Sequence, residues 1–296
     1  MNKFYKQPRT REAARTKSPR VSFPRSLSLI MGMEIFILLA GGLFNVQASD
    51  EVAAGNVVQT DFSSNAAAMT EPQPRLKPGT GKPDPNWQVR HQQLVAQAQA
   101  HRDAKVVFLG DSITDWWNRP IFNHFYQDLD ALNLGVMADG TEHLLWRISN
   151  GELNEVHPKV VVVLIGINNF LHYKQATPEQ VAGGIRAVVT TVQARLPSTK
   201  ILLIGLLPKG EPSDPIRAKI TETNQILASF DDGNNVRFLD IGKAFLNGDG
   251  TIPSTLSHDK LHPTPAGYEV FAEAINPTLF SMLNLPMPAS MTQTNQ

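Results

Sequence analysis

The chain has 296 residues, of which 42% are hydrophobic and 18% are charged, a composition typical of a globular protein with one sizeable domain. The 27 Lys and Arg residues balance the 27 Asp and Glu residues, so the formal net charge is zero, which argues against a strongly basic nucleic-acid binder. The absence of cysteine excludes disulfides, thiol catalysis, cysteine zinc sites and a lipidated N-terminal cysteine.

Residues 1–48 have the pattern of an export signal. The first 26 residues are basic, the apolar run Leu27–Phe44 follows, and Val46 and Ala48 offer small side chains where a signal peptidase reads. This pattern predicts cleavage near Ala48 and a periplasmic or secreted protein. The alternative is an uncleaved inner-membrane anchor, because the run approaches the ~20 residues that span a bilayer.

The chain beyond the signal divides by composition into three segments. Residues 49–84 are rich in Ala, Ser, Asn, Pro and Gly without any period, which predicts a disordered linker. Residues 85–285 carry regular hydrophobic patterns and are predicted to form the folded domain. Residues 286–296 are polar and predicted to form a loose tail.

Short apolar runs alternate with helical patterns through the predicted domain. The runs predict strands at residues 106–110, 131–135, 159–166, 200–207 and 236–241. Helices are expected at residues 87–101, 141–149, 178–196, 215–230 and 264–283, with a short helix or turn at 121–126. This alternation indicates βαβ units, and the sequence therefore predicts a three-layer α/β/α sandwich around a five-stranded parallel sheet.

Polar residues follow three of these strands where each one ends. Asp111 and Ser112 come after the first strand, residues 135–140 after the second, and Asn168 after the third. Because the carboxyl ends of parallel strands meet at one edge of the sheet, these residues are expected to lie close together. Another polar stretch, residues 257–263, precedes the last helix.

These residue types match the needs of acyl transfer through a serine. Ser112 is a weak nucleophile until a base takes its proton, and His262 can be that base. Asp259 lies three residues earlier, so one turn can hold both side chains, as in a catalytic triad. An oxyanion could be bound by the Asn168 amide and by the backbone N–H groups of Ser112 and of the Met137–Ala138 turn, each typically worth ~3 kcal/mol.

Other interpretations of the same residues stay open. Gly-Asp-Ser can be an ordinary turn, Asn168 a turn former, and His262 a residue that caps or packs before the last helix. His258 and His262 are four residues apart, but no helical setting or further ligand supports a metal pair. We therefore predict neither a metal nor a cofactor.

Taken together, these residues resemble the SGNH/GDSL hydrolase family. Its four blocks occur in order as Gly110–Ser112, the turn after the second strand, Gly166–Asn168 and Asp259–His262. Further stretches are similar to the catalytic beta and gamma subunits of the intracellular platelet-activating-factor acetylhydrolases. Those stretches are residues 131–135, 143–147, 150–153, 181–185 and 205–210. The likeness spans roughly residues 87–284.

The resemblance implies a flavodoxin-like fold and assigns residue roles. Ser112 would be the nucleophile, Asp259 and His262 would complete the triad, and Asn168 would donate to the oxyanion. The family usually has Gly as the second-block donor, whereas Ala138 stands there in this chain. A backbone N–H can still be supplied by Ala, but a turn that needs positive φ would strain it by ~1 kcal/mol or more.

The expected function is an exported serine esterase that removes a small acyl group, acetyl by preference, through an acyl-enzyme. Because the export signal looks bacterial and platelet-activating factor is an animal lipid, an acylated envelope or extracellular polysaccharide is the expected substrate. Trp116 and Trp117 could wall the substrate site or pack in the core. The alternatives are a lipid-directed esterase or lysophospholipase, an acyltransferase, and a non-catalytic polysaccharide-binding module. A homodimer is suggested by the resemblance alone.

Overall fold

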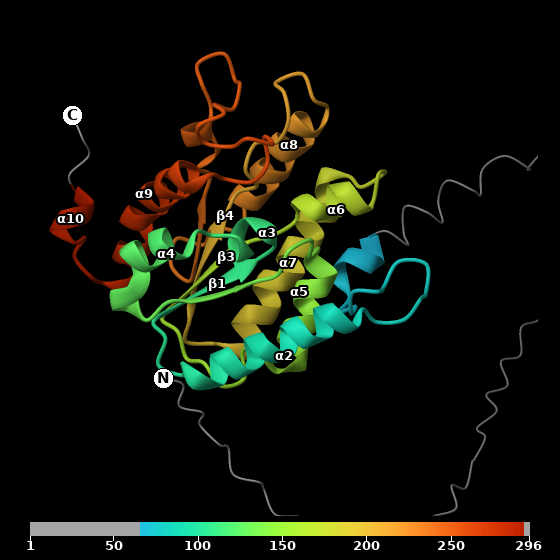
Figure 1. Ribbon diagram of the computed structural model, residues 1–296, viewed down its shortest axis with the longest axis horizontal. Coiled ribbons are helices and arrows are strands. Elements are labelled where there is room, and N and C mark those ends of the chain that lie inside the picture. The colour runs from blue at the N-terminus through green and yellow to red at the C-terminus, as the bar shows by residue number, and fades with distance from the viewer. Residues whose placement is uncertain (1–65, 293–296) are drawn as a thin grey trace, which may run out of the picture. The chain divides into compact units, whose positions relative to one another are not determined.

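The computed structural model describes residues 66–292 and shows one parallel α/β domain (Figure 1). Its strands are β1 (Val106–Gly110), β2 (Leu132–Gly135), β3 (Val160–Leu164), β4 (Lys200–Ile204) and β5 (Val236–Leu239). They pair in the order β2-β1-β3-β4-β5, and every pairing is parallel. All residues of β1 and β3 are buried, as expected for central strands covered on both faces.

Helices cover both faces of this sheet. The longer ones are α2 (Pro85–Ala100), α4 (Arg119–Tyr126), α5 (Thr141–Arg147), α7 (Pro178–Arg195), α8 (Ile216–Ala228) and α9 (Pro265–Leu283). Helices α2, α5, α7 and α8 form one layer, and α4 and α9 lie together on the opposite face (Figure 1). The predicted three-layer α/β/α sandwich with a five-stranded parallel sheet is therefore confirmed.

The shorter elements stand mostly at the ends of the longer ones. Besides the helical residues 66–70, three short helices of the described residues were not predicted: α3 (Ser112–Asp115), α6 (Ile167–His172) and α10 (Ala289–Thr292). Three further turns are helical, namely the 3-10 turns Gln127–Leu129 and Gly242–Phe245 and the π-helical turn Ile148–Glu152. The predicted helix 141–149 therefore ends at Arg147 and continues as this π turn, in which Gly151 takes a φ of 103°.

The segment before α2 corrects the predicted disordered linker. Residues 49–65 lie outside the described residues, as does the predicted export signal, but residues 66–70 are helical and residues 75–84 fold back on themselves in a hairpin-like loop with an antiparallel bridge between Leu76 and Pro83. Met69 is fully buried, and its carbonyl accepts a hydrogen bond from Thr141 Oγ1 at 2.8 Å. For residues 66–84 the prediction is wrong, because a few anchoring side chains hold a segment whose composition resembles a linker.

The predicted loose tail is partly wrong as well. Helix α10 follows α9, and the side chains of Met287 and Met291 pack against the core. Residues 293–296 lie outside the described part of the chain. Within residues 66–292, no helix combines the length and the hydrophobicity needed to cross a bilayer.

Candidate active site

Ser112 is placed by the sharp end of β1. The strand stops at Gly110, and the Asp111 carboxylate accepts the N–H of Ile113 at 3.0 Å, so that Ser112 becomes the first residue of α3. A Cβ at Gly135, the last residue of β2, would lie 2.3 Å from the backbone N of Asp115. Glycine there lets α3 sit directly on the end of the neighbouring strand, which fixes the serine at the carboxyl edge of the sheet.

Ser112, His262 and Asp259 form a continuous hydrogen-bonded chain. Ser112 Oγ lies 2.9 Å from His262 Nε2, and His262 Nδ1 lies 2.6 Å from Asp259 Oδ2. With the proton of the neutral imidazole on Nδ1, that ring nitrogen donates to the carboxylate and leaves Nε2 free to accept the serine proton. The structure thus brings together the three residues that the sequence assigned to a triad.

The loop before α9 holds the carboxylate of this chain. Asp259 Oδ1 accepts the backbone N–H of Leu261 at 3.0 Å and that of His262 at 2.8 Å. Partial burial acts to raise the pKa of Asp259, but the hydrogen bonds from His262 and Leu261 outweigh it and lower the pKa to about 2. Asp259 is therefore ionised at any pH at which an imidazole can act as a base.

The three residues assigned to the oxyanion hole lie at adjacent strand ends. β1 pairs with both β2 and β3, so the turns after these strands meet at one edge. Asn168 Nδ2 donates to the carbonyl of Asp139 at 3.0 Å, which ties α6 to the turn containing Ala138. Within residues 66–292, the backbone N–H groups of Ser112 and Ala138 donate to no acceptor, so both are free to bind an oxyanion.

Ala138 has a positive φ, the conformation that strains an alanine at this position. Its φ is 61°, in the left-handed region that costs a non-glycine residue ~1 kcal/mol or more. The carbonyl of Met137 and the N–H of Ala138 belong to the same peptide unit. The orientation of that peptide therefore depends on the contacts made by its neighbours.

The two tryptophans that follow α3 differ in position. The Trp116 ring lies 4.4 Å from the His262 ring, centroid to centroid, and Trp116 is 48% exposed. Trp117 is only 6% exposed and stacks on Tyr268 with ring centroids 5.2 Å apart. Trp117 therefore packs in the core, and its predicted role in substrate binding is wrong. Of the two tryptophans, only Trp116 can contact a ligand at His262.

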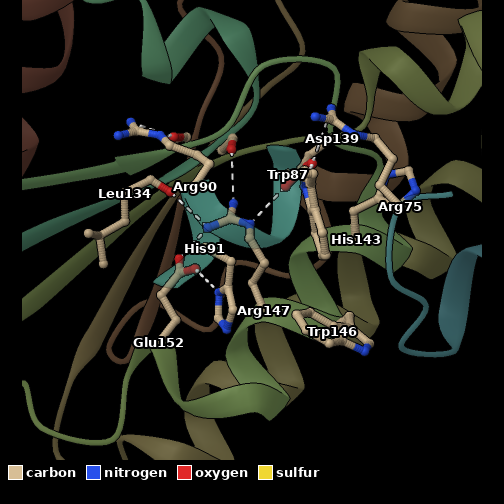
Figure 2. A network of polar contacts seen from close by, with 12 residues as sticks. Arg75, Trp87, Arg90, His91, Leu134, Asp139, His143, Trp146, Arg147 and Glu152 are labelled. Atoms are coloured by element: carbon tan, nitrogen blue, oxygen red, sulfur yellow. Dashed lines mark hydrogen bonds and ion pairs between the residues drawn. The ribbon is translucent and has the colours of Figure 1, made fainter. Parts of the chain in front are cut away.

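A buried charged network beneath the turn was missed by the sequence analysis (Figure 2). Arg147 is fully buried and donates through Nε to Asp139 Oδ2 at 2.7 Å, and it also pairs with Glu152. Burial alone would lower the pKa of Arg147, but these two carboxylates raise it above its ordinary value. A signal was present, because Arg147 interrupts the short run from Leu144 to Ile148, whose other members are apolar, and a buried charge needs an acidic partner.

The same network also forms hydrogen bonds to the strand ends next to the candidate site. Arg147 donates to the carbonyl of Leu134 at 2.9 Å and to that of Gly110 at 3.3 Å. Trp87 Nε1 donates to the other oxygen of Asp139 at 2.7 Å. Arg147 and Trp87 thus fasten the turn after β2 to β1 and to α2, and Figure 2 shows both side chains directed at Asp139.

One cluster of possible metal ligands lies near this network. Glu142, His143 and His172 place one ligand atom each within 4.8 Å of one another. However, His143 Nδ1 accepts the N–H of Gly140 at 2.9 Å, so the neutral ring carries its proton on Nε2. The Glu142 carboxylate already accepts from Asn169 Nδ2 at 2.8 Å. This cluster therefore fits a hydrogen-bonded support for α6 better than a metal site.

A doubly covered parallel sheet that presents a Ser–His–Asp chain at its carboxyl edge defines a serine hydrolase. Comparisons narrow this class. Residues 108–270 match the model of the GDSL-like lipase/acylhydrolase family. The chain is 37% identical to human platelet-activating factor acetylhydrolase IB subunit alpha1 over 202 residues, 68% of this chain and 85% of the relative. The alpha2 subunit from Rattus norvegicus is also 37% identical, over 68% of this chain and 86% of that subunit.

A solved structure supports the same fold. A GDSL-like lipase from Bacteroides thetaiotaomicron superposes with a TM-score of 0.56 at 21% identity, covering 66% of this chain and 98% of the other. The chain belongs to the GDSL-like lipase/acylhydrolase family, and it is a hydrolase of carboxylic esters.

Proposed function

We propose that the chain is a serine esterase that removes a small acyl group, acetyl by preference, through an acyl-enzyme. The observation that carries this proposal is the continuous chain Ser112–His262–Asp259 beside two free backbone N–H groups. The acetyl preference is supported by the relatives, which are named acetylhydrolases.

The geometry supports a two-step mechanism. Ser112 Oγ attacks the ester carbonyl carbon while its proton moves to His262 Nε2, and Asp259 stabilises the resulting imidazolium. The N–H groups of Ser112 and Ala138 and the Asn168 amide bind the oxyanion. The intermediate then expels the alcohol, which takes the proton from His262. Water repeats the sequence on the acyl-serine, releasing the carboxylic acid and restoring the serine hydroxyl.

The proposed substrate is an acylated carbohydrate of the cell envelope or of the extracellular space. Trp116 supports this proposal because its exposed ring lies directly beside His262, where a sugar ring of the leaving group could stack. The proposal of export comes from the pattern of residues 1–48 alone. N-terminal sequencing of the mature protein tests it, since a start at Ser49 indicates cleavage after Ala48 and an intact N-terminus in the membrane fraction indicates an anchor, whereas an intact N-terminus in the cytosolic fraction would contradict export.

A lipid ester is the second candidate substrate. Two exposed apolar side chains adjoin the proposed site, because Trp116 contacts His262 and Met137, which is 47% exposed, precedes Ala138. The relatives are also named for a lipid mediator. A lipid-directed enzyme would hydrolyse long-chain esters faster above their aggregation concentration, whereas a carbohydrate deacetylase would release acetate from acetylated polysaccharide.

Hydrolysis of p-nitrophenyl acetate, butyrate and octanoate by the full chain tests the proposed function. Ser112→Ala and His262→Ala are each expected to lower kcat by at least about 10³-fold. The three residues of the proposed triad act together, so losing one removes most of the effect of all three. The exposed Ser198 and His157 provide matched controls, and alanine at either should leave kcat unchanged. Acetate activity that survives in Ser112→Ala would overturn the proposal.

A further inference from the structure

The peptide that joins Met137 to Ala138 has a cation behind its oxyanion-facing side. The peptide is trans, so its carbonyl and its N–H point in opposite directions. Arg75 Nη1 donates to the Met137 carbonyl at 2.6 Å, while the Ala138 N–H has no acceptor within the described residues. An arginine thus binds one end of the peptide dipole whose other end is assigned to the oxyanion.

Other groups hold the chain on both sides of this peptide, at the N–H of Met137 and at the side chain of Asp139. The N–H of Met137 donates to Asp115 Oδ2 at 3.0 Å, on one side of it. On the other side, the Asp139 carboxylate is held by Trp87 and Arg147. Among the described residues, only Arg75 binds the central carbonyl.

The backbone of Ala138 does not favour the observed orientation by itself. Its φ of 61° costs an alanine ~1–2 kcal/mol relative to the right-handed region. Rotation of the Met137–Ala138 peptide would relieve this strain and turn the N–H away from the site. A charge-assisted hydrogen bond to the carbonyl opposes that rotation.

Arg75 is itself held in place. Its guanidinium lies 3.9 Å from Asp139 Oδ1 and 6.0 Å from the centre of the Trp87 ring, and Figure 2 shows it beside both residues. Its side chain is 22% exposed, so the charge is only partly screened by water. A fixed cation at the carbonyl also polarises the peptide and makes its N–H a stronger donor.

We propose that Arg75 is a positioning residue for ester hydrolysis, which orients and polarises the Met137–Ala138 peptide so that its N–H stabilises the oxyanion. The inference rests on the proposed function, since it assumes that Ala138 N–H is an oxyanion donor. The residue lies outside the matched family region, in the segment that looked like a linker.

Steady-state kinetics of Arg75→Ala, Arg75→Gln and Arg75→Lys test the proposal. The donor itself remains in these variants, so we expect Arg75→Ala to lower kcat about tenfold, less than the 10²–10³-fold loss of a removed donor, with KM within about twofold. Arg75→Lys should keep most of the wild-type kcat, and the kcat of Arg75→Gln should fall between those of Arg75→Lys and Arg75→Ala. Lys77→Ala, in the same segment, is the matched control and should match the wild type.

A second measurement does not depend on turnover. In protein labelled with 15N-alanine, the Ala138 amide proton resonance should move upfield in Arg75→Ala and Arg75→Gln, as hydrogen-bond polarisation is lost, but not in Lys77→Ala. An unmoved resonance together with a kcat within twofold of the wild type would overturn the role of Arg75. Residual activity in Ser112→Ala, with the resonance moved in Arg75→Ala, would contradict the proposed function and leave the polarisation by Arg75 demonstrated.

Discussion

Asp111, next to Ser112, shows how much folding free energy one buried carboxyl group can cost. Its side chain is fully buried, and only Oδ1 is used, as the acceptor for the N–H of Ile113. Oδ2 has no partner within residues 66–292. Burial, assisted by the charge of Asp139, raises the pKa of Asp111 to about 7. A carboxyl group placed here is therefore held in its protonated form below neutral pH.

This raised pKa predicts that stability depends on pH in a definite direction. The folded state binds the proton more tightly than the unfolded state, so the contribution of Asp111 is fully present below about pH 4 and is lost as pH rises through about 7. The loss for this group is at most about 4 kcal/mol, from a shift of roughly three units. Asp111→Asn keeps an acceptor for Ile113 and should remove this dependence.

Urea unfolding at pH 5 and pH 8 measures the effect. The wild type should lose more stability between these two values than Asp111→Asn does. Asp103, which is exposed, provides the matched control, and Asp103→Asn should follow the wild type. Parallel curves for the wild type and Asp111→Asn would show that Asp111 is ionised in the folded protein throughout this range.

At the scale of elements, the end of α5 locks the sheet edge. Arg147, its last residue, binds the carbonyls at the ends of β1 and β2, and its charge is matched by Asp139 and Glu152. All three side chains are fully buried. Breaking such a buried pair is far more destabilising than the pair is stabilising, because an uncompensated charge stays behind.

We therefore expect Arg147→Met to lower the free energy of unfolding by about 3–5 kcal/mol. Because methionine fills a similar volume, the loss of unfolding free energy measures the cost of leaving the two carboxylates without a cation, not the cost of a cavity. Arg195→Met, at the exposed end of α7, should change it by less than about 0.5 kcal/mol. Equilibrium denaturation of both variants checks this expectation, and a loss below about 1 kcal/mol in Arg147→Met would contradict the cost assigned to leaving Asp139 and Glu152 without their cation.

At the scale of the molecule, features set by residues close together in sequence could be predicted, whereas contacts between separate elements could not. The five strands could be predicted because apolar runs record burial locally. The Ser112–His262–Asp259 chain could be predicted because Ser112 follows such a run and Asp259 lies within one turn of His262. Helix α3 has only four residues, too few to show a period. The pairing of Arg147 with Asp139 depends on how β2 and α5 meet, which no local pattern records.

The segment before α2 shows the same limit and leads to the last prediction. Its composition is that of a linker, yet Met69 is buried, Gln73 N–H donates to Glu142 O at 3.1 Å, and Arg75 binds the turn after β2. Removing residues 1–65 should leave thermal stability and ester hydrolysis unchanged. Removing residues 1–84 deletes the Met69 anchor and Arg75, so Tm should fall by several degrees and kcat by about tenfold or more. If the two truncated proteins match in Tm and in kcat, the segment is a linker after all, and the contacts of Met69 and Arg75 contribute nothing.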